Sequence, residues 1–418
     1  MSWSGASNIG SDGFTIDMQE LSFVPKLSED NSLISFGAGS RWREVYAVLK
    51  PENLTAAGGR VGDVGVGGFL LGGGISFTSA EFGFGSDSII NYEVVLGNGS
   101  IVNANRDLHP DLYWALKLGS TNFGVVTQFS MTTLPMGPVW GGSQFFAIKD
   151  APVLLEHLVS FTKKLSDDPK GFLGLSLAWN PQSKDYIIWT LHTYLKPEPY
   201  PVPLWSDFKS SIAKPLMDTM GIKSLMDVTE EFEETDPGKH GRSRWLSMTY
   251  KANVQFHLDL HGKGKELFEP YHDHPGVHWA VSIQPIPARL ASAARNTGGN
   301  PSCLSEEDGD LWVMLITTDW LDPADDDIMN SNAETLLKWA EDESQERGLF
   351  HPFIYMNYAS GSQDVMTRST SHETLQKMRN VKKMYDHEGI LNRLWHGGFK
   401  IQLKEDENKI LEHDRSEL

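Results

Sequence analysis

The sequence predicts an α+β protein of two domains. Its 418 residues are enough for two hydrophobic cores. In the first third, short strand-like and helix-like segments alternate around a stretch that is dense in glycine. From about residue 142 the chain becomes richer in aromatic residues and in polar–apolar alternation, which is typical of an antiparallel sheet. The change occurs around residues 135–138, so we expect a first domain over residues 1–138 and a second from residue 139 onward.

Local signals place the elements of the first domain. Alternation predicts strands at residues 14–17 and 33–36. Ser40 follows a Gly-Ala-Gly turn and is the expected N-cap of a helix over residues 43–49, which Pro51 ends. The next expected elements are a short helix at 75–82, a hairpin at 94–102 that turns at Asn98–Gly99, a helix at 111–117 and a strand at 122–131.

The second part of the chain combines sheet strands with longer helices. Residues 172–179 and 186–193 have the composition of strands and are joined by a turn at 180–184, so we expect an antiparallel pair. Further strands are expected at 254–259, 276–286 and 311–318, and helices at 151–165, 333–347 and 373–385.

The glycine-dense stretch runs from Gly58 to Gly74, and nine of its 17 residues are glycine. Glycine permits positive φ and lets the backbone approach a ligand closely. The stretch is not a phosphate loop of the GxxxxGK[ST] type, and it does not complete a GxGxxG motif. Glycine content alone leaves two interpretations open, which are a backbone cradle for a large ligand and a turn between packed strands.

Composition excludes several classes of partner. The net charge of −19 argues against nucleic acid and against docking on anionic membranes. Cys303 is the only cysteine, so there is no intrachain disulfide and no cysteine metal cluster. No apolar run reaches the roughly 20 residues of a membrane span. The start of the chain lacks signal-peptide features, so we expect a cytoplasmic protein, or a secreted or vesicular one if the native amino terminus is longer.

Two histidines raise the question of a metal. His257 and His261 are four residues apart, which on a helix would place two ligands on one face. No third ligand is evident, and the alternation at residues 254–259 favours a strand, so we assign no metal. A serine hydrolase is not indicated either, because the G-x-S-x-G motif is missing.

Further motifs are spread along almost the whole chain: Val64–Gly68 with Gly72–Ile75, Asp111–Leu116, Asn122–Thr127, Tyr355–Ala359, Tyr385–Gly389 and Gly397–Lys400. In order and spacing they resemble those of the berberine-bridge-enzyme-like flavoproteins, within the wider family of vanillyl-alcohol oxidase and p-cresol methylhydroxylase (PCMH). The carboxyl-terminal motifs, together with Gln284–Pro287, look most like those of fungal members, which often act in pathways that oxidise or cyclise small natural products.

The resemblance implies a PCMH-type FAD-binding fold. The FAD-binding domain would be residues 1–138 completed by residues 360–418, and residues 139–359 would lay an antiparallel sheet over the flavin. The residues implied to contact FAD are Gly65, Gly67, Gly68, Gly72, Gly73 and Gly74 through the backbone, Gly124, Val125 and Val126 at the adenine end, and Asn357 with Tyr355 at the isoalloxazine ring.

The chain departs from the family at its covalent attachment points. Family members carry an R-G-G-H loop, whose histidine bonds the flavin, just upstream of the segment that matches Ser2 to Asn8. Here Met1 stands where the residue after that histidine is expected, so this chain lacks the loop and the first strands of the domain. The second attachment residue is a cysteine, and Val61 stands at its position. FAD is therefore expected to bind non-covalently, if it binds.

The implied activity is oxidation of a small natural-product-like molecule. Hydride would pass to flavin N5 with O2 as acceptor, while a base removes a proton from the substrate. Tyr355 is the first candidate base, and its pKa of about 10 would have to be lowered by its neighbours. Tyr250 and His257 are weaker candidates. The alternatives are a non-redox cyclase or isomerase on the same fold and an inactive binding protein; the oligomeric state is not predicted.

Overall fold

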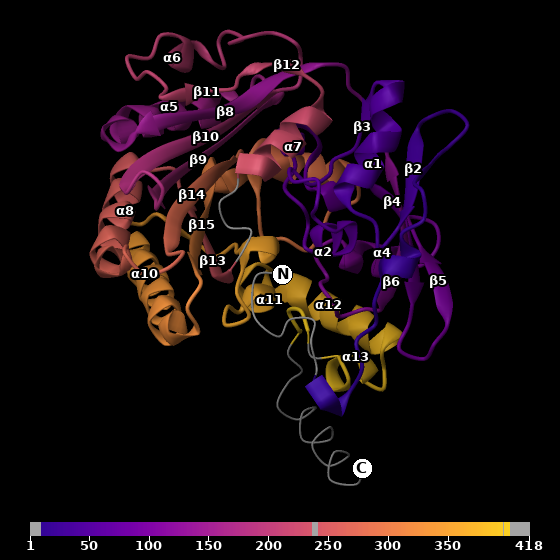
Figure 1. The fold of residues 1–418 in the computed structure, drawn as a ribbon. Helices are drawn as coiled ribbons and strands as arrows, with labels where there is room; N and C mark the ends of the chain where they lie inside the picture. The colour runs from indigo at the N-terminus through magenta and orange to yellow at the C-terminus, as the bar shows by residue number, and fades with distance from the viewer. Residues whose placement is uncertain (1–9, 236–240, 396, 402–418) are drawn as a thin grey trace.

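The computed structural model describes residues 10–235, 241–395 and 397–401, and two antiparallel sheets stand side by side in it (Figure 1). The first sheet has the order β1-β2-β6-β4-β5. Its strands are β1 (Lys26–Leu27), β2 (Leu33–Gly37), β4 (Ile89–Val95), β5 (Ile101–Ala104) and β6 (Val125–Thr132). Beside it, β3 (Leu54–Thr55) pairs with β7 (Leu134–Pro135).

The second sheet has nine strands in the order β11-β8-β10-β9-β14-β15-β13-β16, with β12 also paired to β8. Its central strands are long enough to bury a wide surface on each face. The strands are β8 (Val139–Ala147), β9 (Gly171–Asn180), β10 (Asp185–Tyr194), β11 (Met217–Asp218), β12 (Gly221–Lys223), β13 (Arg242–Lys251), β14 (His278–Ile286), β15 (Leu311–Trp320) and β16 (Phe350–His351).

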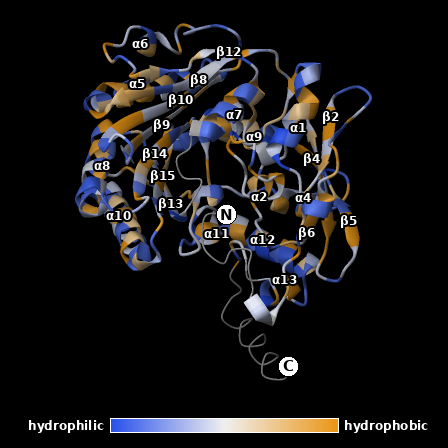
Figure 2. Cartoon of the chain, viewed as in Figure 1, coloured by the Kyte–Doolittle hydropathy of each residue, from blue (hydrophilic) through white to orange (hydrophobic). Residues whose placement is uncertain are grey.

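One face of this second sheet is covered by three helices: α5 (Ala151–Lys164), α8 (Val254–Phe268) and α10 (Asp326–Glu346). Alternate strand residues such as Met248, Val281 and Met314 point into a core shared with these helices. In Figure 2 the outer sides of α8 and α10 are largely hydrophilic, whereas strand residues beneath them are apolar. The helices are therefore amphipathic covers for one side of the sheet.

The first sheet shares its core with the end of the chain. The helices α1 (Trp42–Leu49) and α4 (Pro110–Leu116) pack with α12 (His372–Tyr385) around it. Asn122 fixes the last described residues, because its amide donates to the carbonyl of Phe399 and its oxygen accepts from the amide of Ile401, at 2.8 and 2.9 Å. Lys382 is buried and donates to the carbonyl of Asn122 and to Asp386. Ile354, Met356 and Ala359, which were expected in the second domain, also pack in this first core.

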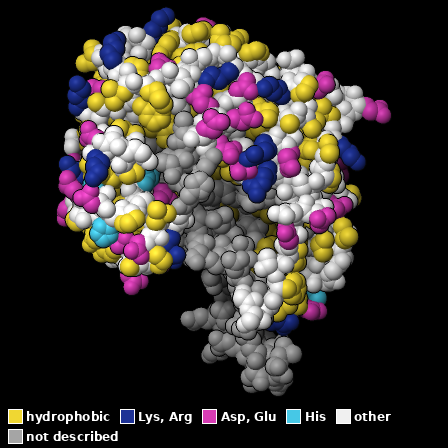
Figure 3. Space-filling view, viewed as in Figure 1, with side chains coloured by type: hydrophobic (Ala, Val, Ile, Leu, Met, Phe, Trp, Pro, Cys, Tyr) yellow, Lys and Arg dark blue, Asp and Glu magenta, His cyan; other side chains and the backbone are white. Residues whose placement is uncertain are grey.

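The other face of the second sheet turns toward the first half of the chain. Ile75, Phe84 and Leu118 from the first half form one buried cluster with Leu311 and Val313 of β15. A helix of the second half, α7 (Leu225–Thr235), also contacts α1. Acidic and basic side chains gather in this region in Figure 3, and Lys50–Asp227 and Arg43–Glu233 are ion pairs of 2.7 and 3.2 Å between the two helices.

The remaining helices are short. They are α2 (Val66–Leu71), α3 (Ser79–Phe82), α6 (Ser206–Lys209), α9 (Arg289–Asn296), α11 (Val365–Arg368) and α13 (Ile390–Arg393). Within the described ranges, no helix combines the length and apolarity that a bilayer crossing requires. In the same ranges, no three His, Cys, Asp or Glu side chains gather as a set of metal ligands.

Most of the expected elements are present. The antiparallel pair β9–β10 has the expected register across the turn at 180–184, and the hairpin β4–β5 turns at Gly99 with φ of 81°. The α+β fold class is confirmed. The expected strand at 14–17 is wrong: this segment pairs with no strand, and Phe14 is 83% exposed. The expected helix at 75–82 is reduced to α3, four residues long.

Two further expectations fail for identifiable reasons. Residues 254–259 begin helix α8 rather than a strand, because Asn253 caps the helix by accepting from the amide of Phe256 and the buried residues follow helical spacing. Ser40 does not cap α1. The N-cap is Arg41, and the carbonyl of Ser40 accepts instead from the amide of Val66, at 3.0 Å. Short alternation alone did not separate these possibilities.

Buried histidines predict an acid-sensitive fold. His192 and His257 are fully buried, and burial lowers the pKa of each from 6.5 to about 3. Because the folded pKa values are lowered, the stabilisation is complete above about pH 6.5 and is lost as the pH falls toward 3. We expect each histidine to remove about 2 kcal/mol of unfolding free energy between pH 7.5 and 5.

Urea denaturation of wild type and His192→Gln at both pH values measures this effect. Between the two pH values, the unfolding free energy of His192→Gln should change by about 2 kcal/mol less than that of wild type. His387→Gln should behave like wild type, since the side chain of His387 is 76% exposed. An unchanged pH dependence in His192→Gln contradicts the prediction.

Candidate active site

We call the whole glycine-dense stretch, residues 58–74, the ribbon. Its first part is anchored on the start of α1. The amides of Trp42 and Arg43 donate to the carbonyls of Val64 and Gly62, at 3.1 and 2.9 Å. The ribbon thus supplies partners that the first turn of a helix cannot find within itself. The Trp42 ring lies so close to Gly58 that a Cβ there would sit 2.2 Å from it.

The middle of the ribbon forms the short helix α2 and leaves backbone accessible. Gly65 is its N-cap, and Gly67 and Gly68 lie in its first turn, where amides have no partner within the helix. A Cβ added at Gly65 or Gly68 would meet nothing within 4 Å, and at Gly67 it would meet only the carbonyl of Ala38 at 3.3 Å. Three of the glycines expected to contact the cofactor therefore border open space.

The end of the ribbon is enclosed by side chains. A Cβ at Gly72 would lie 2.1 Å from Oδ1 of Asn357, and one at Gly74 would lie 2.4 Å from the ring of Phe69. Gly73 and Gly74 have φ values of 92° and 86°, which explains why the sequence uses glycine here. Among the expected cofactor contacts, Gly72, Gly73 and Gly74 are thus in contact with the protein itself in the ligand-free structure.

Tyr355 and Asn357 join the ribbon to the end of the second half. The amide of Ile75 donates to the hydroxyl of Tyr355 at 2.7 Å, and Asn357 donates to that hydroxyl and to the carbonyl of Phe69, at 3.1 and 3.0 Å. Tyr355 is 2% exposed, and burial raises its pKa above the ordinary value of 10. The lowered pKa that a tyrosinate base requires is not provided by these neighbours.

The segment Gly124–Val126 lies at the start of β6. Val125 and Val126 pair with Val95 and Val94 of β4 on one side. On the other side, β2 pairs with β6 only from Gln128 to Thr132, and one more backbone hydrogen bond follows, from Ala38 to Thr127. The backbone of Val125 and Val126 therefore has one edge that no strand of the described chain occupies, as expected of a segment that binds a ligand through main-chain groups. Gly124 packs against Val94, where a Cβ would lie 2.5 Å away.

Tyr250 and His257, the weaker candidate bases, lie outside this site. Both are 0% exposed, and the Tyr250 hydroxyl is 2.7 Å from Nδ1 of His257. Tyr250 points toward α8, on the helix-covered face of the second sheet, so the sheet separates it from the ribbon. Both residues were expected at the site because residues 254–259 have the alternation of a strand, whereas they begin helix α8. We withdraw both residues as catalytic candidates.

Arg60 is a residue that the sequence analysis missed. Its guanidinium lies 4.9 Å from the centre of the Phe172 ring on β9 and donates to the hydroxyl of Tyr358. It thus links the ribbon to both the sheet and the Tyr355–Tyr358 segment. In the described residues, no carboxylate forms an ion pair with Arg60. A single cation within a glycine-dense run was the available sequence signal.

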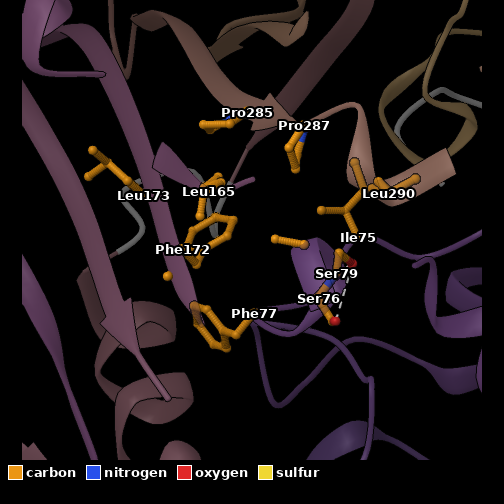
Figure 4. A pocket seen from close by; sticks show the side chains of 12 residues that line it. Ile75, Ser76, Phe77, Ser79, Leu165, Phe172, Leu173, Pro285, Pro287 and Leu290 are labelled. Atoms are coloured by element: carbon orange, nitrogen blue, oxygen red, sulfur yellow. Dashed lines mark hydrogen bonds between the residues drawn. The ribbon is translucent and has the colours of Figure 1, made fainter. Parts of the chain in front are cut away.

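A cavity lies where the ribbon continues into the second sheet. Figure 4 shows Ile75, Ser76 and Phe77 on one side and Phe172 and Leu173 of β9 on the other. The rings of Phe77 and Phe172 meet edge to face at 5.3 Å. The cavity has room for about one water molecule, so it marks the junction of the two halves rather than a complete ligand site.

Comparisons with known proteins define the class first. Residues 1–105 match the model of an FAD binding domain. FAD-dependent monooxygenase tpcD of Cochliobolus heterostrophus is 33% identical over 417 residues, which cover 95% of this chain and 77% of that protein. FAD-dependent monooxygenase FUP4 of Fusarium proliferatum is 32% identical over 400 residues, which cover 93% of this chain and 76% of that protein. The protein is thus an FAD-linked oxidoreductase.

More specifically, the chain belongs to the family of these fungal FAD-dependent monooxygenases, which confirms the resemblance stated above. Solved structures agree on the fold. 6-Hydroxy-D-nicotine oxidase of Arthrobacter nicotinovorans superposes with a TM-score of 0.74 at 16% identity, covering 92% of this chain and 81% of that one. Glycopeptide hexose oxidase DBV29 gives 0.70 at 18% identity, with 90% and 82% covered.

The residues present fit part of an FAD site. The open backbone at Gly65, Gly67 and Gly68 and the free edge at Val125–Val126 are the features that an elongated, backbone-bound ligand needs. Buried polar atoms without a partner also occur beside the ribbon, at Oγ of Ser40 and Nε1 of Trp42.

Two glycines of the ribbon distinguish ligand contact from folding. Gly68→Ala places a methyl group in open space, so the ligand-free fold should keep its stability or gain up to about 1 kcal/mol. If Gly68 contacts FAD, the same methyl group should weaken FAD binding at least about tenfold, because backbone approach is blocked.

Gly74→Ala is the matched control. Its φ of 86° and the Phe69 ring at 2.4 Å should cost about 1–3 kcal/mol of stability. FAD fluorescence titration and urea denaturation of both variants test the pair. Unchanged FAD affinity in Gly68→Ala removes Gly68 from the site.

Proposed function

We propose that this protein binds FAD along the ribbon, between the two sheets, and oxidises a small natural-product-like molecule with O2 as the final acceptor. The observation that carries the proposal is the pairing of accessible backbone at Gly65–Gly68 with the inner face of the second sheet, joined through Tyr355 and Asn357. When bound, FAD supplies the acceptor for a hydride equivalent from the substrate.

The proposed division of labour follows the two sheets. Residues 1–138 with 360–418 form the FAD-binding domain, and residues 139–359 form the substrate domain. The shared core of α4 and α12 with the first sheet supports the return of the carboxyl-terminal part. Ile354, Met356 and Ala359 pack in that core, whereas Tyr355 and Tyr358 belong to the cluster shared with β15, so residues 354–359 form the junction of the two proposed domains. Water would be excluded from the space between the sheets by the aromatic contact of Phe77 with Phe172.

We infer that FAD is held without a covalent bond in this chain. Val61 cannot form a thioether at the position of the family's attachment cysteine. Cys303 does not replace it, because its thiol packs near Arg368 and burial raises its pKa to about 12. Binding therefore depends on hydrogen bonds and packing. Acid precipitation of the FAD-loaded chain should release the flavin into the supernatant, and flavin retained in the pellet contradicts the inference.

Reconstitution with FAD tests the function directly. Purified protein incubated with FAD and then desalted should keep a visible flavin absorption band. After anaerobic photoreduction, that band should return on admission of air. Protein that keeps no flavin, or reduced flavin that air does not restore, contradicts the proposal. Turnover of a candidate substrate with no oxygen uptake would favour the non-redox alternative.

Tyr355 is proposed to act through a neutral hydroxyl. Burial keeps its pKa raised, so the phenol is protonated at neutral pH and can donate one hydrogen bond while it accepts from Ile75 and Asn357. If the ionised tyrosine acted as a base instead, the rate would keep increasing with pH into the alkaline range, as the ionised fraction of the phenol increases.

Tyr355→Phe separates the two roles. The variant should bind FAD but be less stable by about 1–3 kcal/mol, because the buried amide of Ile75 loses its acceptor. The rate of anaerobic flavin reduction by substrate should fall about tenfold or more, with the shape of its pH profile unchanged. Loss of an alkaline limb in the variant would restore Tyr355 as the base, and an unchanged rate would remove it from the mechanism.

A further inference from the structure

Gln284 is a buried amide without hydrogen bonds. It lies on β14, is 3% exposed, and neither its Oε1 nor its Nε2 has a partner. A primary amide offers two donors and an acceptor, and burial without partners is unfavourable for each. Folding alone does not account for glutamine at this position, since an apolar residue of the same length would avoid the penalty.

Gln284 lies on the face of the second sheet that turns toward the first half of the chain. Its register partner on β15 is Val313, which belongs to the buried cluster shared with Ile75 and Tyr355. Paired residues of an antiparallel sheet point to the same face, so Gln284 points away from the helix-covered core. On the same face, Gly174 of β9 has no side chain, and a Cβ there would make only ordinary contacts of 3.6 Å or more.

A second unpartnered group stands in the same row. Thr249 of β13 is the other register partner of Val313, is 0% exposed, and its Oγ1 has no hydrogen bond. Gln284 and Thr249 are two strands apart, which is roughly 10 Å at the usual strand spacing. Two unpartnered polar groups thus flank Val313 on the face of the sheet that packs against Ile75 and Tyr355.

Another glutamine shows what a structural role looks like. Gln363 is 8% exposed, and its Oε1 accepts from the amides of Ser247 and Ser360 at 3.0 and 3.2 Å. Its Nε2 donates to the carbonyl of Ser247 at 2.7 Å. Gln363 thus completes the edge of β13. Gln284 is buried to a similar extent, yet its carboxamide makes no hydrogen bond to the described protein.

We propose that the carboxamide of Gln284 binds the substrate and selects for an edge on which a hydrogen-bond acceptor stands beside a donor, as in a lactam, an amide or a hydroxycarbonyl compound. This inference rests on the proposed function. Such an edge satisfies both atoms of Gln284 at once, and Thr249 takes a further polar group of the same molecule. The pyrimidine ring of the flavin also has a hydrogen-bond acceptor beside a donor, so it is the competing partner for Gln284. The ribbon, however, offers the cofactor its own amides on the opposite wall.

Two probes that differ by one donor test the selection. 2-Pyridone presents a carbonyl beside an N–H, whereas N-methyl-2-pyridone lacks the donor. Calorimetric titration of the FAD-loaded protein should give at least about tenfold tighter binding of 2-pyridone to wild type. Gln284→Met, which keeps the side-chain length, should bind the two probes equally. A wild type that does not discriminate, or a variant that still does, overturns the proposal.

FAD affinity and the visible flavin spectrum show whether Gln284 binds the substrate or the flavin. Both should be unchanged in Gln284→Met. Weaker FAD binding with a shifted spectrum would assign Gln284 to the flavin and overturn the proposal. A wild type that retains no flavin shows failure of the proposed function. The same calorimetric titration is then run on the protein without FAD, where equal binding of the two probes overturns the role of Gln284 separately.

Thermal unfolding of the ligand-free protein gives a readout that needs no ligand. Gln284→Met should raise the melting temperature, because an unpartnered amide is removed from the interior. The matched control Gln363→Met should lower it, because three backbone groups lose their partners. A decrease in Gln284→Met as large as that in Gln363→Met would show a structural role and contradict the proposal.

Discussion

The hydrogen bonds of Tyr355 and Asn357 to the ribbon are the contact on which the arrangement of the site depends. They connect backbone at Phe69 and Ile75 to a segment about 280 positions later in the chain. The contact is possible only because Gly72 has no Cβ, since any side chain there would overlap Asn357. The glycines of the ribbon thus have two different roles, one in its middle and one at its end. Its middle leaves backbone open, and its end lets another part of the chain come close.

The second sheet also has two parts with different roles, which are its two faces. Each long strand alternates between a face packed on α5, α8 and α10 and a face turned to the ribbon. The helix-covered face is mostly apolar, and polar groups on it such as the Tyr250 hydroxyl and the Trp312 indole find partners on the covering helices. The inner face mixes apolar residues with unpartnered polar atoms, such as those of Gln284 and Thr249, which is what a wall that meets a ligand requires. Arg60 of the ribbon contacts this inner face through the ring of Phe172.

The sequence predicted those parts of the fold whose signal is local. The pair β9–β10 and the hairpin β4–β5 were readable because period-two alternation flanked clear turns. The ribbon was readable from glycine content, and Tyr355 and Asn357 from the family resemblance. Tyr250 and His257 were misplaced because the face of a residue depends on whether its segment is strand or helix. Gln284 was noted only as part of a motif, because its lack of hydrogen-bond partners appears only when the register of the neighbouring strands is known. Arg60 was missed because its contacts, Phe172 and Tyr358, lie far away in the sequence.

Absent partners also explain why the site and the fold need not be optimised together. A buried amide such as that of Gln284 lowers the stability of the ligand-free chain, whereas Gln363 raises it with the same chemical group. Natural proteins keep such groups where function benefits from them, and stability is recovered elsewhere. Here the compensation is visible in the helix-covered core and in the shared core of α4 with α12. Single unpartnered atoms also occur in the helix-covered core, such as Nε1 of Trp179 and of Trp205. Gln284 differs from these residues because both polar atoms of its side chain lack a partner in the described chain, on the face of the sheet that turns toward the ribbon.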